Sequence, residues 1–146
     1  MAVRVQTDDF DLGAEAEALE AGGAAGAVVT FTGVVRGGDV TAMTLEHYPV
    51  MTEAALSEIE AEARDRWPLT GVTIVHRVGR LSPGDRIMMV ACASAHRAAA
   101  FEAASFLMDF LKTRAPFWKK EELVSGEAKW VDAREADDEA AARWEA

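Results

Sequence analysis

The sequence contains a single cysteine, Cys92, and this scarcity excludes several classes of protein. One thiol cannot form an internal disulfide or a CxxC metal or redox site, and such cysteine usage fits a reducing cytoplasm. Cys92 lies in the apolar run IMMVACAS, which favours a buried structural thiol over a nucleophile. The chain also has no apolar run of about 18 residues and no basic-then-apolar leader, so we expect neither a membrane span nor a secretory signal.

Positive charge is scarce as well. The 15 Lys and Arg residues stand against 25 Asp and Glu residues, which gives a formal net charge of −10. This charge argues against nucleic acid or an anionic membrane as a general partner, because both need a broad positive field. A small anion can still bind where a few cations form a local basic pocket. With 146 residues, half of them apolar, we expect a single domain over residues 1–146.

The common catalytic signatures are missing. The sequence has no GxxxxGK[ST], HExxH or GxSxG motif and no GxGxxG after a strand. The three histidines, His47, His76 and His96, have no close His, Cys, Asp or Glu at ligand spacing, so no metal site is expected. His76 and Arg77 fall in the middle of an expected strand, where structural roles are favoured, with Arg77 bridging to an acidic neighbour.

The pattern of apolar residues and turn signals predicts a mixed α+β domain with antiparallel hairpins rather than regular βαβ alternation. The segment 42–48, which follows the short loop GGDVT, is expected to be the partner strand of 26–37. Pro83 and Gly84 suit the centre of a tight turn, which predicts a hairpin between 71–81 and 85–94. The remaining strands are predicted at 3–7, 117–123 and 128–133, and the helices at 11–22, 52–67, 94–113 and 134–146.

Two of these helices carry more detailed expectations. Thr52 is the expected N-cap of the helix 52–67, and Ser94 is the expected N-cap of the helix 94–113. Pro116 is expected to end the second of these helices. Its apolar residues at helical spacing predict a buried stripe of Phe101, Ala104, Leu107, Met108 and Leu111.

Basic residues at the ends of elements indicate an anion site. Arg36 lies where the strand 26–37 runs into Gly37-Gly38, and His96 and Arg97 fall in the first turn of the helix 94–113. Two cations at a helix N-terminus oppose the helix dipole unless an anion offsets them. The pair therefore favours an oxyanion or phosphate site there. The alternative is that both side chains extend into solvent.

Lysine is concentrated in one stretch. The chain has four lysines against eleven arginines, and Lys112, Lys119 and Lys120 all fall in LKTRAPFWKKEEL (111–123). Guanidinium stays protonated, whereas the pKa of an ammonium beside other cations falls below its free value of about 10.4, so that it can act as an acid or base. The cluster indicates a need for amines, and a solvated basic turn is the alternative. Phe117 and Trp118 would form either a dry wall of such a site or plain core.

Five segments, in their order and spacing, resemble the large, catalytic subunits of molybdopterin synthase over roughly residues 26–144: GAVVTFTGVVR, LEHYPVM, VHRVGRLSPGD, SAHRAAAFEAASFLMDFLKTRAPFWKKE and WVDA. The resemblance implies an α/β-hammerhead-type fold and a homodimer that binds two small ubiquitin-like sulfur-carrier subunits, giving a heterotetramer. The carrier's Gly-Gly tail, ending in a thiocarboxylate, would insert into a pocket of this chain. Its sulfur would convert cyclic pyranopterin monophosphate into molybdopterin. This implies a cytoplasmic sulfurtransferase with no cofactor and no catalytic cysteine, because the partner brings the sulfur.

The resemblance also implies residue roles. Arg36, His96 and Arg97 correspond to residues that bind the pterin phosphate and the incoming tail, and Lys112 and Lys119 correspond to the two active-site lysines. Val34 stands where some relatives carry a basic side chain, so a contact there is made by the backbone or is replaced. The loop GGDV is also short, which affects its part in closing over the substrate. The implied substrate-binding set is Val34, Val35, Arg36, His96, Arg97, Lys112, Lys119, Lys120 and Glu121.

Two other functions compete with the sulfurtransferase. One is a non-enzymatic dimeric module that binds a phosphate-bearing ligand through Arg36, His96 and Arg97. The other is a purely structural dimer scaffold, which the cations at a helix N-terminus disfavour. The lysine cluster separates the first alternative from the enzyme, because arginine would serve anion binding equally well.

Overall fold

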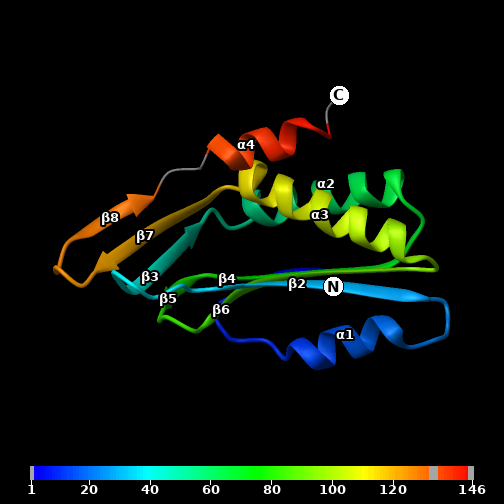
Figure 1. Ribbon diagram of the computed structural model, residues 1–146, viewed down its shortest axis with the longest axis horizontal. Coiled ribbons are helices and arrows are strands. Elements are labelled where there is room, and N and C mark those ends of the chain that lie inside the picture. Colours follow the sequence, from blue (N-terminus) through cyan, green and yellow to red (C-terminus); the bar gives the residue numbers. More distant parts are fainter. Residues whose placement is uncertain (1, 132–134, 145–146) are drawn as a thin grey trace.

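The computed structural model describes residues 2–131 and 135–144. Within them the chain forms two four-stranded sheets and four helices, so the predicted mixed α+β fold is confirmed (Figure 1). The first sheet has the order β1 (Val3–Gln6), β4 (Leu69–Arg77), β6 (Arg86–Ser94) and β2 (Ala27–Val34). The second has the order β5 (Gly79–Leu81), β3 (Val40–His47), β7 (Phe117–Leu123) and β8 (Ala128–Val131).

Helices cover both faces of the first sheet (Figure 1). Helix α1 (Leu12–Glu20) lies on one face, and α2 (Met51–Arg66) and α3 (Arg97–Arg114) lie on the other, with α4 (Glu135–Ala142) against α3. None of the described helices is long and apolar enough to cross a membrane. The second sheet extends beyond the end of α3, away from the described helices (Figure 1).

The continuous apolar run of β6 follows from this layering. Met89 and Ala91 pack towards α1, while Val90 and Cys92 belong to the core under α2 and α3. A strand covered on both faces has no solvent side and therefore loses the usual polar alternation. Phe106 of α3 is the largest fully buried side chain of this core.

The predicted partner of β2 is wrong. β2 pairs with β6, whereas β3, the segment expected beside β2, pairs with β5 and β7 in the other sheet. The chain turns away because Val35 is bonded to the turn after β5: its N–H donates to the Asp85 carbonyl at 2.9 Å, and its carbonyl accepts from Gly84 at 2.9 Å. The buried Val35 side chain then packs with the apolar residues of the second sheet.

The hairpin predicted around Pro83-Gly84 is confirmed in part. β4 pairs antiparallel with β6 as expected. The chain before the turn does not stay in that sheet, however, because Gly79 has a positive φ of 97° and directs β5 onto the edge of β3. One predicted strand thus contributes to both sheets.

Both predicted N-caps are wrong. Ser94 is the last residue of β6, and its hydroxyl donates to the Pro68 carbonyl at 2.8 Å, so α3 begins with His96 in the cap position. Val50 precedes α2, and Thr52 lies within the helix, fully buried. Of the predicted stripe of α3, Ala104, Leu107 and Leu111 are buried as expected, Met108 is half-buried, and Phe101 is exposed.

The backbone at Gly26, just before β2, lies close to the backbone at Ala95, and this contact predicts an effect on stability. A Cβ on Gly26 would lie 2.1 Å from the carbonyl oxygen of Ala95, a backbone atom that cannot rotate away. Gly26→Ala should therefore lower the free energy of unfolding, measured by urea denaturation, by about 2 kcal/mol or more. Gly13→Ala in α1 is the matched control, because its Cβ would meet only Asp11 Oδ1 at 3.5 Å. It should be neutral or stabilising by about 0.5–1 kcal/mol, and equal losses in both variants would contradict the argument.

Candidate functional site

Two of the predicted lysines lie where the two sheets meet the end of α3. Lys112 is in the last turn of α3, which ends at Arg114. Pro116 cannot continue the helix and holds the preceding Ala115 extended, at φ −81° and ψ 128°, so the chain passes directly into β7. Lys112 and Lys119 are both close enough to the buried His76 of β4 for their charges to lower its pKa. Phe117, two residues before Lys119 in β7, stacks on His76, so the strand that carries Lys119 passes beside this histidine.

The pleat of β7 separates its two lysines. Lys119 pairs with Leu45 of β3, which is buried, and residues paired across a sheet share a face. Lys119 therefore lies on the inner face of the second sheet. Lys120 lies on the outer face, where its Nζ is 5.9 Å from the ring centre of Trp130. The alternation of side chains along β7 therefore places these two lysines on opposite faces of the sheet.

Glu121 shares the inner face with Lys119. It pairs with Met43 of β3, which is buried, and with Lys129 of β8. The neighbouring Glu122 faces outward and forms an ion pair with Arg80, in which Arg80 Nε lies 2.9 Å from Glu122 Oε2. Glu121 is thus the carboxylate of β7 on the same side as the candidate amines.

His76 is the buried titratable group of this site. Only 4% of it is exposed, and its ring stacks on that of Phe117 with centroids 3.7 Å apart and an interplanar angle of 16°. Its Nδ1 lies 2.8 Å from the Arg77 carbonyl, which can only accept, so Nδ1 carries the proton. Burial lowers the pKa of His76 to about 4, and the neighbouring basic groups Lys112, His47 and Lys119 lower it in the same direction.

The two aromatic residues of the APFWKK stretch have different roles. Phe117 lies inside, between the stacked His76 and the ring of His47, whose centroid is 6.4 Å away. Trp118 is 40% exposed on the outer face, edge-on to Tyr48 at 4.4 Å. A shallow pocket of about 300 Å³ opens on that outer side, lined by Glu46, His47, Tyr48, Trp118 and Trp130.

Arg36 lies beyond the end of β2. It is exposed, and none of the ion pairs between described residues involves it. Val34 is half exposed beside it, at a bulge in the pairing of β2 with β6. Val35 is buried, and both of its backbone polar groups are bonded to the turn at 82–85. Val35 therefore anchors the loop that carries Arg36.

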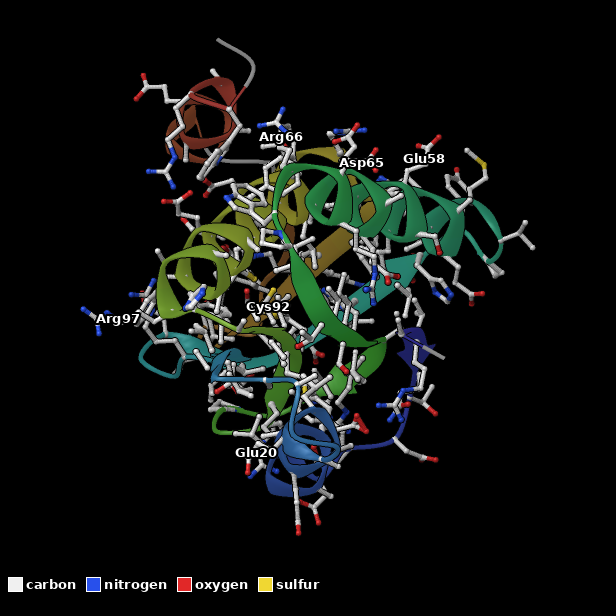
Figure 2. All side chains as sticks on the ribbon, turned by 90° about the vertical axis from the view of Figure 1, so that its right-hand side faces the viewer. Glu20, Glu58, Asp65, Arg66, Cys92 and Arg97 are labelled. Carbon is white, nitrogen blue, oxygen red and sulfur yellow. The ribbon has the colours of Figure 1, made fainter. Side chains whose placement is uncertain are left out.

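His96 and Arg97 lie at the opposite end of the molecule. Both are exposed at the start of α3, His96 makes no side-chain capping bond, and Figure 2 shows Arg97 pointing away from the protein. Fifteen residues of helix separate Arg97 from Lys112, which is about 22 Å along the axis. Arg36 is also remote from His96 and Arg97, because β2 begins opposite Ser94 but ends opposite Arg86, at the end of the sheet where His76 pairs with Met88. Within one chain, the predicted site residues thus form two separate groups.

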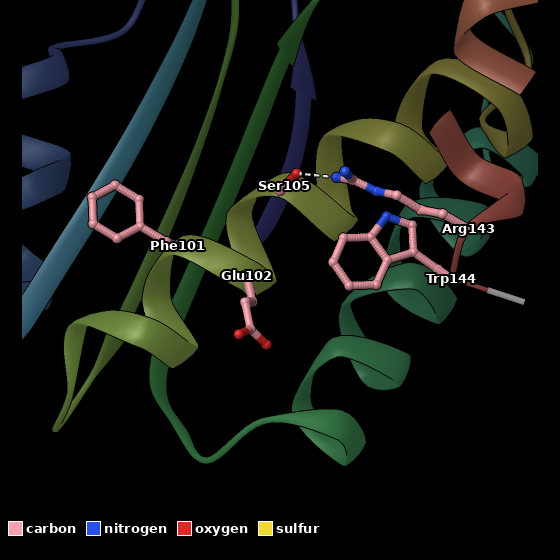
Figure 3. A pocket seen from close by; sticks show the side chains of 5 residues that line it. All are labelled: Phe101, Glu102, Ser105, Arg143 and Trp144. Carbon is pink, nitrogen blue, oxygen red and sulfur yellow. Dashed lines mark hydrogen bonds between the residues drawn. The ribbon is translucent and has the colours of Figure 1, made fainter. Parts of the chain in front are cut away.

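A second pocket lies between α3 and the end of the chain. It has a volume of about 370 Å³ and is lined by Phe101, Glu102, Ser105, Arg143 and Trp144 (Figure 3). Arg143 donates to Ser105 Oγ at 2.6 Å and to Asp109 at 3.0 Å, so its polar groups are used in fastening α4 to α3. This pocket contains none of the predicted site residues.

Cys92 is not placed to react, and the described acidic residues form no metal-binding cluster. Cys92 is fully buried under α2 and α3 (Figure 2), and burial raises the pKa of its thiol to about 12. A thiol in this state is not a nucleophile at neutral pH, which agrees with the structural role predicted for it. In the part of the chain that the structure describes, no group of three or more His, Cys, Asp or Glu side chains is placed to hold a metal ion.

Sequence reasoning missed two residues of this region. The structural role expected for His76 did not include its place beside the strand that carries Lys119. Thr52 was expected to be a cap, yet its hydroxyl donates to the Pro116 carbonyl at 3.1 Å. Arg77 does make the predicted acidic contact, with Nη1 4.0 Å from Asp9 Oδ1. No local signal marks His76 or Thr52, because both act on a segment more than 35 residues away in the chain.

The structure is thus an α+β protein in which Lys112 and Lys119 lie at the junction of the two sheets with the end of α3. The family model described as MoaE protein matches residues 5–114, and the chain belongs to this family. The resemblance seen in the sequence is thereby confirmed. The molybdopterin synthase catalytic subunit of Pseudomonas aeruginosa is 57% identical over 150 residues, covering 99% of each chain.

Solved structures agree with this assignment. The molybdopterin biosynthesis MoaE protein of Burkholderia ambifaria superimposes with a TM-score of 0.86 at 57% identity, covering 100% of this chain and 99% of that one. A Helicobacter pylori protein, described as a complex of subunits 1 and 2 of molybdopterin-converting factor, has a TM-score of 0.75 at 18% identity and covers 92% of both chains. At that identity the second likeness shows the fold alone.

His76 should make the stability of the fold depend on pH. It stays neutral in the native state down to about pH 4 but protonates near 6.5 in the unfolded chain, so the unfolded state binds more protons between these values. The free energy of unfolding should therefore fall as the pH drops from about 6.5 to about 4, by an amount on the order of 3 kcal/mol from this group, and level off below.

Urea denaturation at a series of pH values tests this expectation. His76→Phe keeps a stacked ring but cannot titrate, so it should remove this part of the pH dependence. His96→Gln, at an exposed position, is the matched control and should keep the wild-type slope. A slope that is unchanged in His76→Phe would show that other groups cause the acid sensitivity.

Proposed function

We propose that this chain is the catalytic subunit of a molybdopterin synthase, a cytoplasmic sulfurtransferase. It would transfer sulfur from the thiocarboxylated C-terminus of a small ubiquitin-like carrier to cyclic pyranopterin monophosphate, forming the dithiolene of molybdopterin. The observation that carries the proposal is the convergence of Lys112 and Lys119 beside the buried His76, in a member of the MoaE family. The names of the similar proteins support the same reaction.

The chemistry of sulfur transfer suits a pair of amines. Each transfer exchanges sulfur for oxygen, leaving a carboxylate on the carrier and a thiolate on the pterin. Reactant and products are anionic, so fixed ammonium groups stabilise the charge that develops between them. We assign proton transfer, or the close contact with the thiocarboxylate, to Lys119 and a fixed electrostatic contact to Lys112. Glu121 lies on the same inner face of β7 as Lys119.

The sulfur must come from a partner. Cys92 is the one thiol in the sequence, and it is buried with a raised pKa, so this chain offers no sulfur donor. A carrier that ends in a thiocarboxylate would supply the sulfur that this chain does not. The same fold in the Helicobacter pylori protein is described in a complex of two subunits, which supports a second, small subunit here.

We further propose that a homodimer completes the anion site. β2 is an edge strand with no described strand on its outer side, and exposed apolar side chains lie on β2 and α3, namely Phe31, Val34 and Phe101. Such an edge is a template for pairing with a second copy. Antiparallel pairing about a two-fold axis would place Arg36, at the end of one β2, beside the start of the other, where His96 and Arg97 of the partner subunit lie.

The alternative of a non-enzymatic phosphate-binding dimer makes the same use of Arg36, His96 and Arg97. It differs at the lysines, because binding an anion needs only a positive charge. Arg and Lys both supply that charge, but only Lys can act as an acid or base near neutral pH. Substitution of Lys119 therefore separates the two functions.

Lys119→Arg and Lys119→Ala should lose comparable activity, on the order of 10²-fold or more if proton transfer is involved. The measurement is single-turnover formation of dithiolene product at saturating thiocarboxylated carrier. Lys120→Ala is the matched control, because Lys120 is adjacent on the outer face and should cost far less. Lys112→Arg should keep part of the activity that Lys112→Ala loses. Full activity in Lys119→Arg would instead favour the binding module.

The composite anion site is tested by complementation. Arg97→Ala alone should weaken substrate binding by about 1.5–3 kcal/mol, the value of one charge-assisted contact. Lys119→Ala and Arg97→Ala homodimers should both be impaired, whereas co-expression forms mixed dimers in which one of two sites is intact. An equal mixture should then recover about a quarter of wild-type activity. Recovery no greater than the sum of the two homodimers would show that both residues serve a site within one chain.

A further inference from the structure

The start of β7 is contacted by buried polar side chains from two other elements. Among the described residues, the buried polar side chains are Thr52, Thr73, His76 and Ser94. Two of these, Thr52 of α2 and His76 of β4, contact the same dipeptide, Pro116-Phe117. Lys119 follows two residues later on the same face of the strand as Phe117.

Thr52 fixes the backbone at this point. Its hydroxyl accepts the Tyr48 N–H at 3.2 Å and donates to the Pro116 carbonyl oxygen at 3.1 Å. The residue is fully buried, so no water competes for these bonds. The carbonyl of Pro116 belongs to the peptide group that leads into Phe117, and Thr52 therefore sets the position of the first peptide of β7.

His76 fixes the same segment through a side chain. Its ring lies flat on the ring of Phe117 at 3.7 Å, and its own orientation is held by the bond from Nδ1 to the Arg77 carbonyl at 2.8 Å. This stack joins β4 of the first sheet to β7 of the second. Because side chains alternate along a strand, the tilt of Phe117 and the direction of Lys119 are set together.

We infer that Thr52 and His76 are positioning residues for Lys119, which they hold in place by fixing Pro116 and Phe117. The inference rests on the proposed function of Lys119 in sulfur transfer. A buried polar residue that served only the core would satisfy its own hydrogen bonds anywhere nearby. These two instead approach the lysine-bearing strand from separate elements and meet at one peptide. A catalytic amine needs such support, because a displacement of about 1 Å can cost on the order of 10²-fold in rate.

The position of the Lys119 side chain can be followed by NMR, without measuring activity. The chain has only four lysines, so the NMR spectrum of protein labelled with ¹³C at lysine Cε contains four sets of signals, each assigned by a Lys→Arg variant. His76→Ala should shift the Lys119 signal and leave that of Lys129, on the exposed strand β8, in place. His76→Phe, which keeps a ring against Phe117, should return the Lys119 signal close to its wild-type position.

Kinetics on the complete complex with the carrier should follow the same order. His76→Ala should lower kcat for sulfur transfer by about tenfold to hundredfold with little change in the KM for the carrier, and His76→Phe should stay near wild type. Thr52→Val removes the bond to Pro116 at nearly constant shape and should resemble His76→Ala. Thr52→Ser keeps the hydroxyl and should resemble wild type. If His76→Ala does not fold, the comparison of Thr52→Val with Thr52→Ser tests the inference.

The inference is overturned if folded His76→Ala and Thr52→Val leave both the Lys119 signal and kcat unchanged. It is also overturned if His76→Phe moves the Lys119 signal as far as His76→Ala does, because the stacked ring would then not be the cause. Failure of the proposed function looks different. The wild-type complex would then form no dithiolene at all, while the lysine signals would still show whether the two residues position Lys119.

Discussion

The burial of α3 against the first sheet is the constraint on which the rest of the structure depends. Its apolar face, with Phe106 and Leu107 fully buried, packs over β6 and β2 and fixes the direction of the helix. Both ends of the helix carry proposed site residues, Arg97 at one and Lys112 at the other. One packing interaction therefore sets where the two groups of proposed site residues lie, and it keeps them apart within a single chain.

The elements themselves were predictable from local patterns, but their pairing was not. Apolar spacing, Gly-rich breaks and Pro116 located most of the described strands and helices to within a few residues, although the predicted strand 71–81 is two strands. The predicted bounds at 133, 134 and 146 lie outside the described residues. The sequence offers no signal that β3 leaves β2, because that outcome depends on hydrogen bonds from Val35 to Asp85 and Gly84, about 50 residues away. The caps failed for a similar reason: Ser94 and Thr52 satisfy distant carbonyls of Pro68 and Pro116 instead of their own helices.

The candidate site was predictable as a set of residue types and not as an arrangement. Lys112 and Lys119 stand out because the chain otherwise uses arginine, and β alternation alone separates Lys119 from Lys120. The separation of Arg97 from Lys112 becomes clear only from the structure, in which α3 packs lengthwise along the first sheet. The importance of His76 depends on a stack with Phe117, and a contact between two sheets leaves no trace in the spacing of either strand.

The chain crosses between the two sheets through very short connections. A single residue, Val78, separates β4 from β5, four residues lead back from β5 to β6, and only Ala115 and Pro116 separate α3 from β7. Sheets tied together in this way cannot swing as independent bodies, because a hinge needs several residues free to change their dihedral angles. The junction is therefore built to its working dimensions when the protein folds. Any ligand of this site must therefore enter from an open side, because the two sheets do not move apart to admit it.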